Sequence, residues 1–192
     1  MVSYRNLMYG LVNKAVEDLV ISQFGEDKWE AILAKAGLDV EVFVSNESYP
    51  DEMTYQLVGA ASEVLGLPAE QILIAFGEHW VLHTAVESYG PMMKSGGATL
   101  KDFLVNLPNF HTRVAMIFPN LQPPRFECTE VTEESLTLHY FTHRPGLQPF
   151  VVGLIQGLGK LYGTPAQARL TASRDEGADH DEFAIRWEKA AA

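Results

Sequence analysis

The sequence contains a single cysteine, Cys128, and no uninterrupted apolar run of the roughly 18 residues that a membrane span needs. One cysteine excludes a disulfide framework or a thiolate zinc cluster within the chain and is typical of a reducing compartment. Residues 1–10 lack the apolar core of a signal peptide. We therefore expect a cytoplasmic protein without a membrane partner, in which Cys128 is a small buried hydrophobe.

Basic residues are also few, with 14 Lys and Arg against 25 Asp and Glu and a formal charge of −11. This charge repels a phosphate backbone, so nucleic acid is not an expected partner. With 192 residues, 47% of them hydrophobic, the chain can form one well-packed core with room for a ligand. We expect a single domain over residues 8–188, with residues 1–7 as a short extension and 189–192 as a tail.

The periodicity of apolar residues changes about two thirds of the way along the chain. Helical spacing predicts helices over residues 11–24, 28–36, 54–65, 68–89 and 99–118, the last with a kink or restart at Pro108. We predict a short extended piece at 40–45 and a loop at 90–97. Strands are predicted over 126–131, 136–142, 168–173 and 183–187, with a helix over 148–162. This order predicts an α+β fold, with an N-terminal helical layer packed on a C-terminal four-stranded antiparallel sheet that carries a crossing helix.

A binding site for an anion is predicted at the end of the second strand, where Tyr140, Thr142 and Arg144 occupy alternate positions. Side chains alternate along a strand, so these three share one face with Leu138. A phenol, a hydroxyl and a guanidinium can converge on one carboxylate. We call these three residues the anion clamp, and the pattern predicts a ligand with an acidic rim and an apolar body.

One polar residue, His111, lies on the apolar stripe of the predicted helix 99–118, four residues after Leu107 and three before Val114. A buried neutral imidazole needs a partner, and a metal ion is one such partner. A core histidine bonded to a carbonyl or a carboxylate is the commoner arrangement. On this residue alone, both interpretations stay open.

The other histidines are given structural roles. His139 and His143 are predicted on the strand face opposite the anion clamp, either exposed or packed on the sheet, with no role in the site that the clamp forms. His79 and His83 have helical i, i+4 spacing, but no further zinc ligands are evident near them. A solvated acidic loop between strands is predicted around His180, formed with Asp175, Glu176, Asp179, Asp181 and Glu182.

A histidine on an apolar helix and an arginine–tyrosine clamp on a strand together supply what heme requires: an iron ligand, an apolar slot and partners for two propionates. The run Tyr140-Phe141-Thr142-His143-Arg144 is similar to the Tyr-x-Ser-x-Arg signature of the heme nitric oxide/oxygen-binding (H-NOX) family, which includes the sensor domain of soluble guanylate cyclase. Three further segments resemble the family's amino terminus, its middle helix and its proximal-histidine segment: MYGLVNKA at 8–15, FGEHW at 76–80 and NLPNFH at 106–111.

The resemblance implies a heme b cofactor between the helical layer and the sheet, with His111 as the iron ligand and Tyr140, Thr142 and Arg144 holding the propionates. Thr142 replaces the usual serine but keeps the hydroxyl. The remaining residues implied to contact the cofactor are Pro124, which would press on the porphyrin, and Trp80, Phe150, Leu154 and Val12.

The position corresponding to the distal tyrosine of oxygen-binding family members is Phe150, which cannot donate a hydrogen bond. The resemblance therefore implies a sensor, not an enzyme, that binds nitric oxide and carbon monoxide and discriminates against oxygen. It also implies that release of His111 signals to an effector protein in trans, a histidine kinase or a nucleotide cyclase.

Two other functions are alternatives to a heme-based sensor. A heme-free module could bind an apolar carboxylate through Arg144 alone. An enzyme, either a heme catalyst or a hydrolase using His111, is disfavoured because the sequence has no Gly-x-Ser-x-Gly elbow and no paired-carboxylate arrangement.

Overall fold

The structure, a computed structural model, describes residues 7–117 and 123–188. It divides into two compact units, Met1–Phe76 and Gly77–Ala192. Expectations for residues 1–6, Phe118 and 189–192 lie outside the described residues. Leu7 belongs to the first strand, and the expected single domain over 8–188 stays a prediction.

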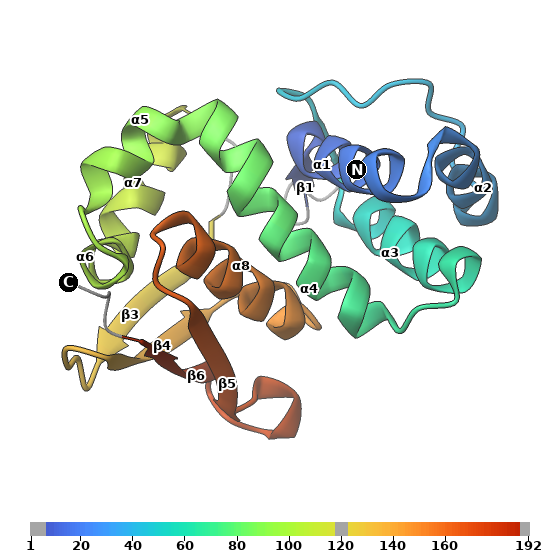
Figure 1. The fold of residues 1–192 in the computed structure, drawn as a ribbon. Coiled ribbons are helices and arrows are strands. Elements are labelled where there is room, and N and C mark those ends of the chain that lie inside the picture. The colour runs from blue at the N-terminus through green and yellow to red at the C-terminus, as the bar shows by residue number, and fades with distance from the viewer. Residues whose placement is uncertain (1–6, 118–122, 189–192) are drawn as a thin grey trace. The chain divides into compact units, whose positions relative to one another are not determined.

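The first unit is helical apart from one short strand pair (Figure 1). Its elements are β1 (Leu7–Tyr9), α1 (Gly10–Phe24), α2 (Glu26–Ala36), β2 (Ser48–Pro50), α3 (Asp51–Leu65) and most of α4 (Ala69–His79). Strands β1 and β2 pair antiparallel, with Met8 opposite Tyr49. The helices predicted at 11–24, 28–36 and 54–65 are thereby confirmed within a few residues.

The extended piece predicted at 40–45 is not a strand. Ser45, at the end of this segment, and Glu47 instead cap the start of α1. The Gly10 amide donates to the Glu47 carbonyl (2.8 Å), and the Leu11 amide donates to the Ser45 carbonyl (3.1 Å). These bonds satisfy two of the amides that every helix start leaves unpaired. A Cβ at Gly10 would lie 2.1 Å from the Val44 carbonyl oxygen, so only glycine allows this approach.

The helical part of the second unit begins with a π-helix, η1 (Trp80–Ala85), directly after α4. It continues as α5 (Val86–Gly96), so the loop predicted at 90–97 is wrong. Pro91 lies inside α5, where it deprives the Glu87 carbonyl of a donor. Both residues are exposed, so the carbonyl that loses its donor does not lie in the core, and the helix continues.

The segment predicted as one helix over 99–118 is two helices, α6 (Leu100–Val105) and α7 (Leu107–Ile117). The Thr99 hydroxyl caps α6, and Asp102 completes a reciprocal capping box. Pro108 occupies the second position of α7, where its missing N–H has no intrahelical partner to lose. The expected break at Pro108 is therefore a restart of the helix.

The sheet of the second unit has the antiparallel order β3-β4-β6-β5. Its strands are β3 (Arg125–Thr129), β4 (Ser135–Phe141), β5 (Ala166–Ala172) and β6 (Asp181–Trp187), and α8 (Gln148–Leu161) precedes β5. The predicted α+β class, with four antiparallel strands and one crossing helix, is confirmed (Figure 1).

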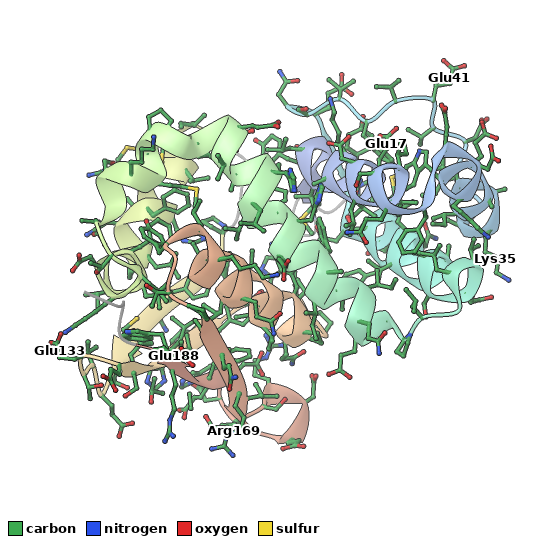
Figure 2. The ribbon with its side chains drawn as sticks, viewed as in Figure 1. Glu17, Lys35, Glu41, Glu133, Arg169 and Glu188 are labelled. Carbon is green, nitrogen blue, oxygen red and sulfur yellow. The ribbon has the colours of Figure 1, made fainter. Side chains whose placement is uncertain are left out.

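Strict alternation gives the sheet two different faces. Leu136, Leu138 and Tyr140 are buried, and each of their neighbours along β4 is only half-buried. Asp181, Phe183, Ile185 and Trp187 of β6 are buried in the same way. Apolar residues of α8, including Val151, Ile155 and Leu158, complete the core on this face. On β5 the Arg169 side chain is exposed and projects from the sheet (Figure 2).

Helix α8 crosses the α4–η1 segment at two glycines. A Cβ at Gly77 would lie 2.3 Å from the Phe150 carbonyl oxygen, and a Cβ at Gly157 would lie 2.9 Å from the Val81 Cβ. The ion pair between Lys160 and Glu78 lies beside this crossing. The crossing therefore fixes the position of Phe150 relative to the start of η1.

Among the described residues, no single helix is both long and apolar enough to cross a membrane. One bent pair, Asp51–Leu65 with Ala69–Gly96, passes the same test by length and composition when the two helices are taken together.

Candidate functional site

His111 lies on α7 with its imidazole held in one orientation. Its Nδ1 lies 3.0 Å from the carbonyl oxygen of Leu107, one helical turn earlier. A carbonyl oxygen only accepts, so Nδ1 carries the proton and Nε2 presents a lone pair. Nε2 has no hydrogen-bond partner among residues 7–117 and 123–188. Burial lowers the pKa of His111, and the bond to Leu107 acts in the opposite direction. The imidazole is therefore kept neutral, as metal ligation requires.

An aromatic bridge connects His111 to the anion clamp. The Phe126 ring on β3 lies 4.9 Å from the His111 ring, measured between centroids. The same Phe126 ring stacks on Tyr140 of β4 at 5.2 Å and an interplanar angle of 28°. Phe126 and Tyr140 are buried, with 5% and 4% of their surface exposed. The structure thus brings the predicted iron ligand and the predicted clamp to one side of the sheet, through a residue that the sequence analysis did not single out.

The anion clamp is not built as a continuous strand. Strand β4 ends at Phe141, so Thr142 and Arg144 lie in the following turn. The Arg144 amide donates to the Thr142 hydroxyl oxygen at 3.1 Å, which is a side-chain-to-backbone turn. The strand prediction to Thr142 was one residue too long, because this local bond competes with the sheet ladder.

The turn nevertheless brings the clamp groups together. The Thr142 hydroxyl and the nearby Arg144 charge both favour the phenolate form of Tyr140. Desolvation outweighs both, so the pKa of Tyr140 is raised. Arg144 is buried, with 7% of its surface exposed. A buried guanidinium beside a buried phenol gives this side of the site a fixed positive charge for an anionic group.

Three residues behind the clamp, Arg174, Asp181 and Gln148, hold the turn in place through hydrogen bonds. Arg174 donates to the Thr142 carbonyl oxygen. The Arg174 amide in turn donates to a carboxylate oxygen of Asp181 at 2.9 Å, and Gln148 donates to the same oxygen at 3.3 Å. Asp181 is only 2% exposed and pairs with Tyr140 across β6 and β4. Sequence analysis placed Asp181 in a solvated acidic loop, but its position at the start of β6 makes it a buried anchor.

The residues predicted to line the rest of the site are distributed over both units. Trp80 begins η1, and Phe150 and Leu154 lie on α8, with Gly77 against their backbone. Pro124 lies directly before β3 and is half-buried. Val12 lies on α1 in the other unit, so its part in the site stays a prediction. The π-helix at Trp80 had no sequence signal, although such segments are frequent at functional sites.

Comparison with known proteins gives the class of this chain. The sequence model of the Haem-NO-binding family matches residues 9–170. Soluble guanylate cyclase gcy-34 of Caenorhabditis elegans is 33% identical over 157 residues, which are 80% of this chain and 23% of that protein. The chain thus spans less than a quarter of this curated relative.

Solved structures share the fold. An H-NOX protein from S. oneidensis in the Fe(II)NO ligation state superimposes with a TM-score of 0.85 at 20% identity, covering 95% of this chain and 100% of that one. The Fe(II) unliganded H-NOX protein from K. algicida gives a TM-score of 0.84 at 23% identity, with coverages of 96% and 99%. The fold is therefore that of the H-NOX proteins. Together with the match over residues 9–170, this shows that the chain belongs to the Haem-NO-binding (H-NOX) family.

Proposed function

We propose that this chain is a heme-based gas sensor that takes heme b as its cofactor. The observation that carries the proposal is the half-buried His111 imidazole, whose Nδ1 is held by the Leu107 carbonyl and whose ring contacts Phe126, the residue that stacks on Tyr140 of the anion clamp. The lone pair that Nε2 keeps is the donor that an iron ligand needs. These residues fit heme in donor type, charge and polarity.

In this proposal His111 Nε2 is the iron ligand, and Tyr140, Thr142 and Arg144 hold the propionates. Pro124, Trp80, Phe150, Leu154 and Val12 form the apolar surround. When bound, heme supplies an iron position that takes a diatomic gas. The protein supplies the fixed imidazole, the charge complement for two carboxylates and a surround that excludes water.

The distal side is proposed to favour nitric oxide and carbon monoxide over oxygen. Bound oxygen carries partial negative charge and gains from a hydrogen-bond donor. Phe150 has no donor to offer. The Phe150 backbone is fixed against Gly77, so the ring at this position is presented by a rigid helix crossing.

Signalling is proposed to use α7. Release of His111 would free this helix from its tether, and two positions of one helix are what a ligand-biased switch requires. The effector is proposed to act in trans and to belong to the histidine kinase or nucleotide cyclase class, and the similarity to soluble guanylate cyclase gcy-34 supports the second of these classes.

The test is an anaerobic absorption spectrum of the reduced protein, before and after nitric oxide. We expect a Soret band that shifts with nitric oxide in the wild type, is lost in His111→Gly and returns when imidazole is added. His83→Gly, at an exposed histidine on η1, is the matched control and should leave the spectrum unchanged.

A protein that stays colourless after heme reconstitution would overturn the proposal. If such a protein bound a long-chain carboxylate and lost it in Arg144→Met, the heme-free module would be supported instead. A Soret band that is unaffected by His111→Gly would overturn the ligand assignment alone.

A further inference from the structure

The outer face of the sheet carries a cluster that the gas-sensor proposal does not use. His139 of β4 and Glu182 of β6 are register partners on the face opposite Tyr140 and Asp181, and His180 lies just before β6. Sequence analysis predicted His139 as a surface or packing residue and His180 as part of a solvated loop. Their side chains are instead largely covered, with 16% and 18% exposed.

Three donor atoms of this cluster form a compact triangle. His139 Nδ1 lies 2.8 Å from His180 Nε2. Glu182 Oε1 lies 3.4 Å from the first nitrogen and 3.3 Å from the second. Ligands about 2.0–2.1 Å from a tetrahedral zinc ion are about 3.3–3.4 Å from one another. Two edges of the triangle already match this value, and the third, at 2.8 Å, needs to open by roughly half an ångström.

A hydrogen bond and a ring contact orient the two imidazoles toward the centre of this triangle. His139 Nε2 lies 2.7 Å from the Thr129 hydroxyl, so the nitrogen that points away from the triangle has a partner. The His180 ring stacks on Phe141 with centroids 4.1 Å apart and an interplanar angle of 22°. Metal-ligating histidines are characteristically held through their second nitrogen in this way.

The second nitrogen of His180 lacks such a bond within the described parts of the chain. Nδ1 is buried and has no hydrogen-bond partner there, although Asp179 Oδ2 lies 3.4 Å away. Asp179 is exposed and free to rotate its carboxylate toward Nδ1. A carboxylate–histidine–metal arrangement would satisfy this buried group. In the metal-free protein, the two facing imidazole nitrogens form one hydrogen bond of 2.8 Å, which coordination of a cation would replace.

We propose that His139, His180 and Glu182 form a second metal site, which takes one zinc ion with the fourth position open to water. Two neutral imidazoles and one carboxylate suit zinc and other borderline transition metals, whereas calcium and magnesium prefer all-oxygen sites. The site joins β4 to the connection that precedes β6. The same connection carries Arg174, which donates to the Thr142 carbonyl oxygen. Zinc would therefore stabilise the segment that holds the turn of the anion clamp.

The test is equilibrium dialysis of the full chain, without a polyhistidine tag, against zinc, followed by elemental analysis of zinc and iron. We expect one zinc per chain in the wild type. His180→Ala and Glu182→Gln should each weaken binding by more than about 10-fold, because loss of even an outer-sphere partner costs about 10–100-fold. Thr129→Val should weaken it by about 10-fold for that outer-sphere reason.

His83→Ala is the matched control, because His79 and His83 form the other close histidine pair, with ring centroids 4.5 Å apart. It should leave zinc binding unchanged. Zinc should also raise the unfolding temperature of the wild type and of His83→Ala, but not of Glu182→Gln. Glu182→Gln keeps the side-chain shape, so it remains informative if His180→Ala does not fold.

The proposal is overturned if the wild type shows no saturable zinc uptake. It is also overturned if Glu182→Gln binds zinc as the wild type does, or if His83→Ala abolishes uptake. None of these outcomes depends on heme, because zinc and iron are measured separately.

Discussion

Phe126 stacks on Tyr140 with ring centroids 5.2 Å apart, and its ring is also 4.9 Å from the His111 imidazole. A single buried side chain on the edge strand therefore spaces the proposed iron ligand from the clamp. Any change in its volume alters both neighbours at once.

Phe126→Ala is expected to lower the free energy of unfolding by about 3–5 kcal/mol, because it removes a buried ring and leaves a cavity. Phe126→Leu keeps most of the volume and should cost less than about 1.5 kcal/mol. Urea unfolding followed by circular dichroism measures both values. Equal losses in the two variants would show that the cavity is not the cause.

Gly77→Ala is expected to destabilise the protein by about 1–3 kcal/mol, because the new methyl group would overlap the Phe150 carbonyl oxygen. Gly90→Ala is the matched control, since a Cβ there meets nothing within 4 Å and α5 gains from the better helix former. That variant should be more stable by about 0.5–1 kcal/mol. Thermal unfolding of both proteins distinguishes crowding from helix propensity, and a stabilised Gly77→Ala would contradict the close crossing.

Cys128 is expected to react slowly with alkylating reagents. Burial raises the pKa of its thiol to about 11 from an ordinary value of 9.0, and Sγ contacts the Leu104 carbonyl oxygen at 3.4 Å. At pH 8 the thiolate fraction is then about 100-fold below that of an unfolded cysteine. Iodoacetamide labelling with and without urea, read by mass spectrometry, measures the difference.

The same shift predicts a pH dependence of stability. The unfolded thiol loses its proton near pH 9 and the folded thiol only near pH 11, so the unfolded state gains relative stability between these values. Stability should therefore fall as the pH rises through this window. The fall should be smaller in Cys128→Ala, and an identical decline in both proteins would assign it to other groups.

Phe150→Tyr is expected to create oxygen affinity if the proposed gas-sensor function holds. A phenol at this position can donate to bound oxygen, and one hydrogen bond of about 1.5 kcal/mol corresponds to about 10-fold slower oxygen loss. Phe150→Leu changes the ring without adding a donor and should not acquire this property. Stopped-flow spectra of the reduced proteins mixed with aerated buffer give the rates. Oxygen binding by the wild type would contradict the distal assignment.

The fold class and most helices could be predicted from the sequence, because apolar periodicity reports directly which face of an element is buried. The predictions failed at two places in the helical part of the second unit, the predicted loop at 90–97 and the π-helix at 80–85. Pro91 and three glycines suggested a loop at 90–97, but the helix continues because Pro91 and Glu87 are exposed. The π-helix at 80–85 differs from an α-helix by one residue in its winding, and no residue type marks that difference.

The candidate site was predictable in its charged and polar members but not in its supports. His111 and Arg144 are conspicuous as polar groups on apolar faces. Phe126 looked like any other strand residue, and Asp181 like one more member of an acidic run. Only the pairing of β4 with β6 shows that Asp181 is buried opposite Tyr140, and strand pairing is a long-range property that a linear pattern does not contain.

The wider winding of η1 carries a consequence for the chain beyond it. Each residue advances an α-helix by about 100°, so winding the same 6 residues of η1 as an ordinary α-helix would turn everything downstream by roughly that angle. Met93, now 4% exposed, would swing out of the interior. Gly96, whose missing Cβ leaves space for the Phe103 ring, would face elsewhere. The extra residue in the π-turn therefore sets the rotation at which α5 presents Met93 and Gly96 to the core.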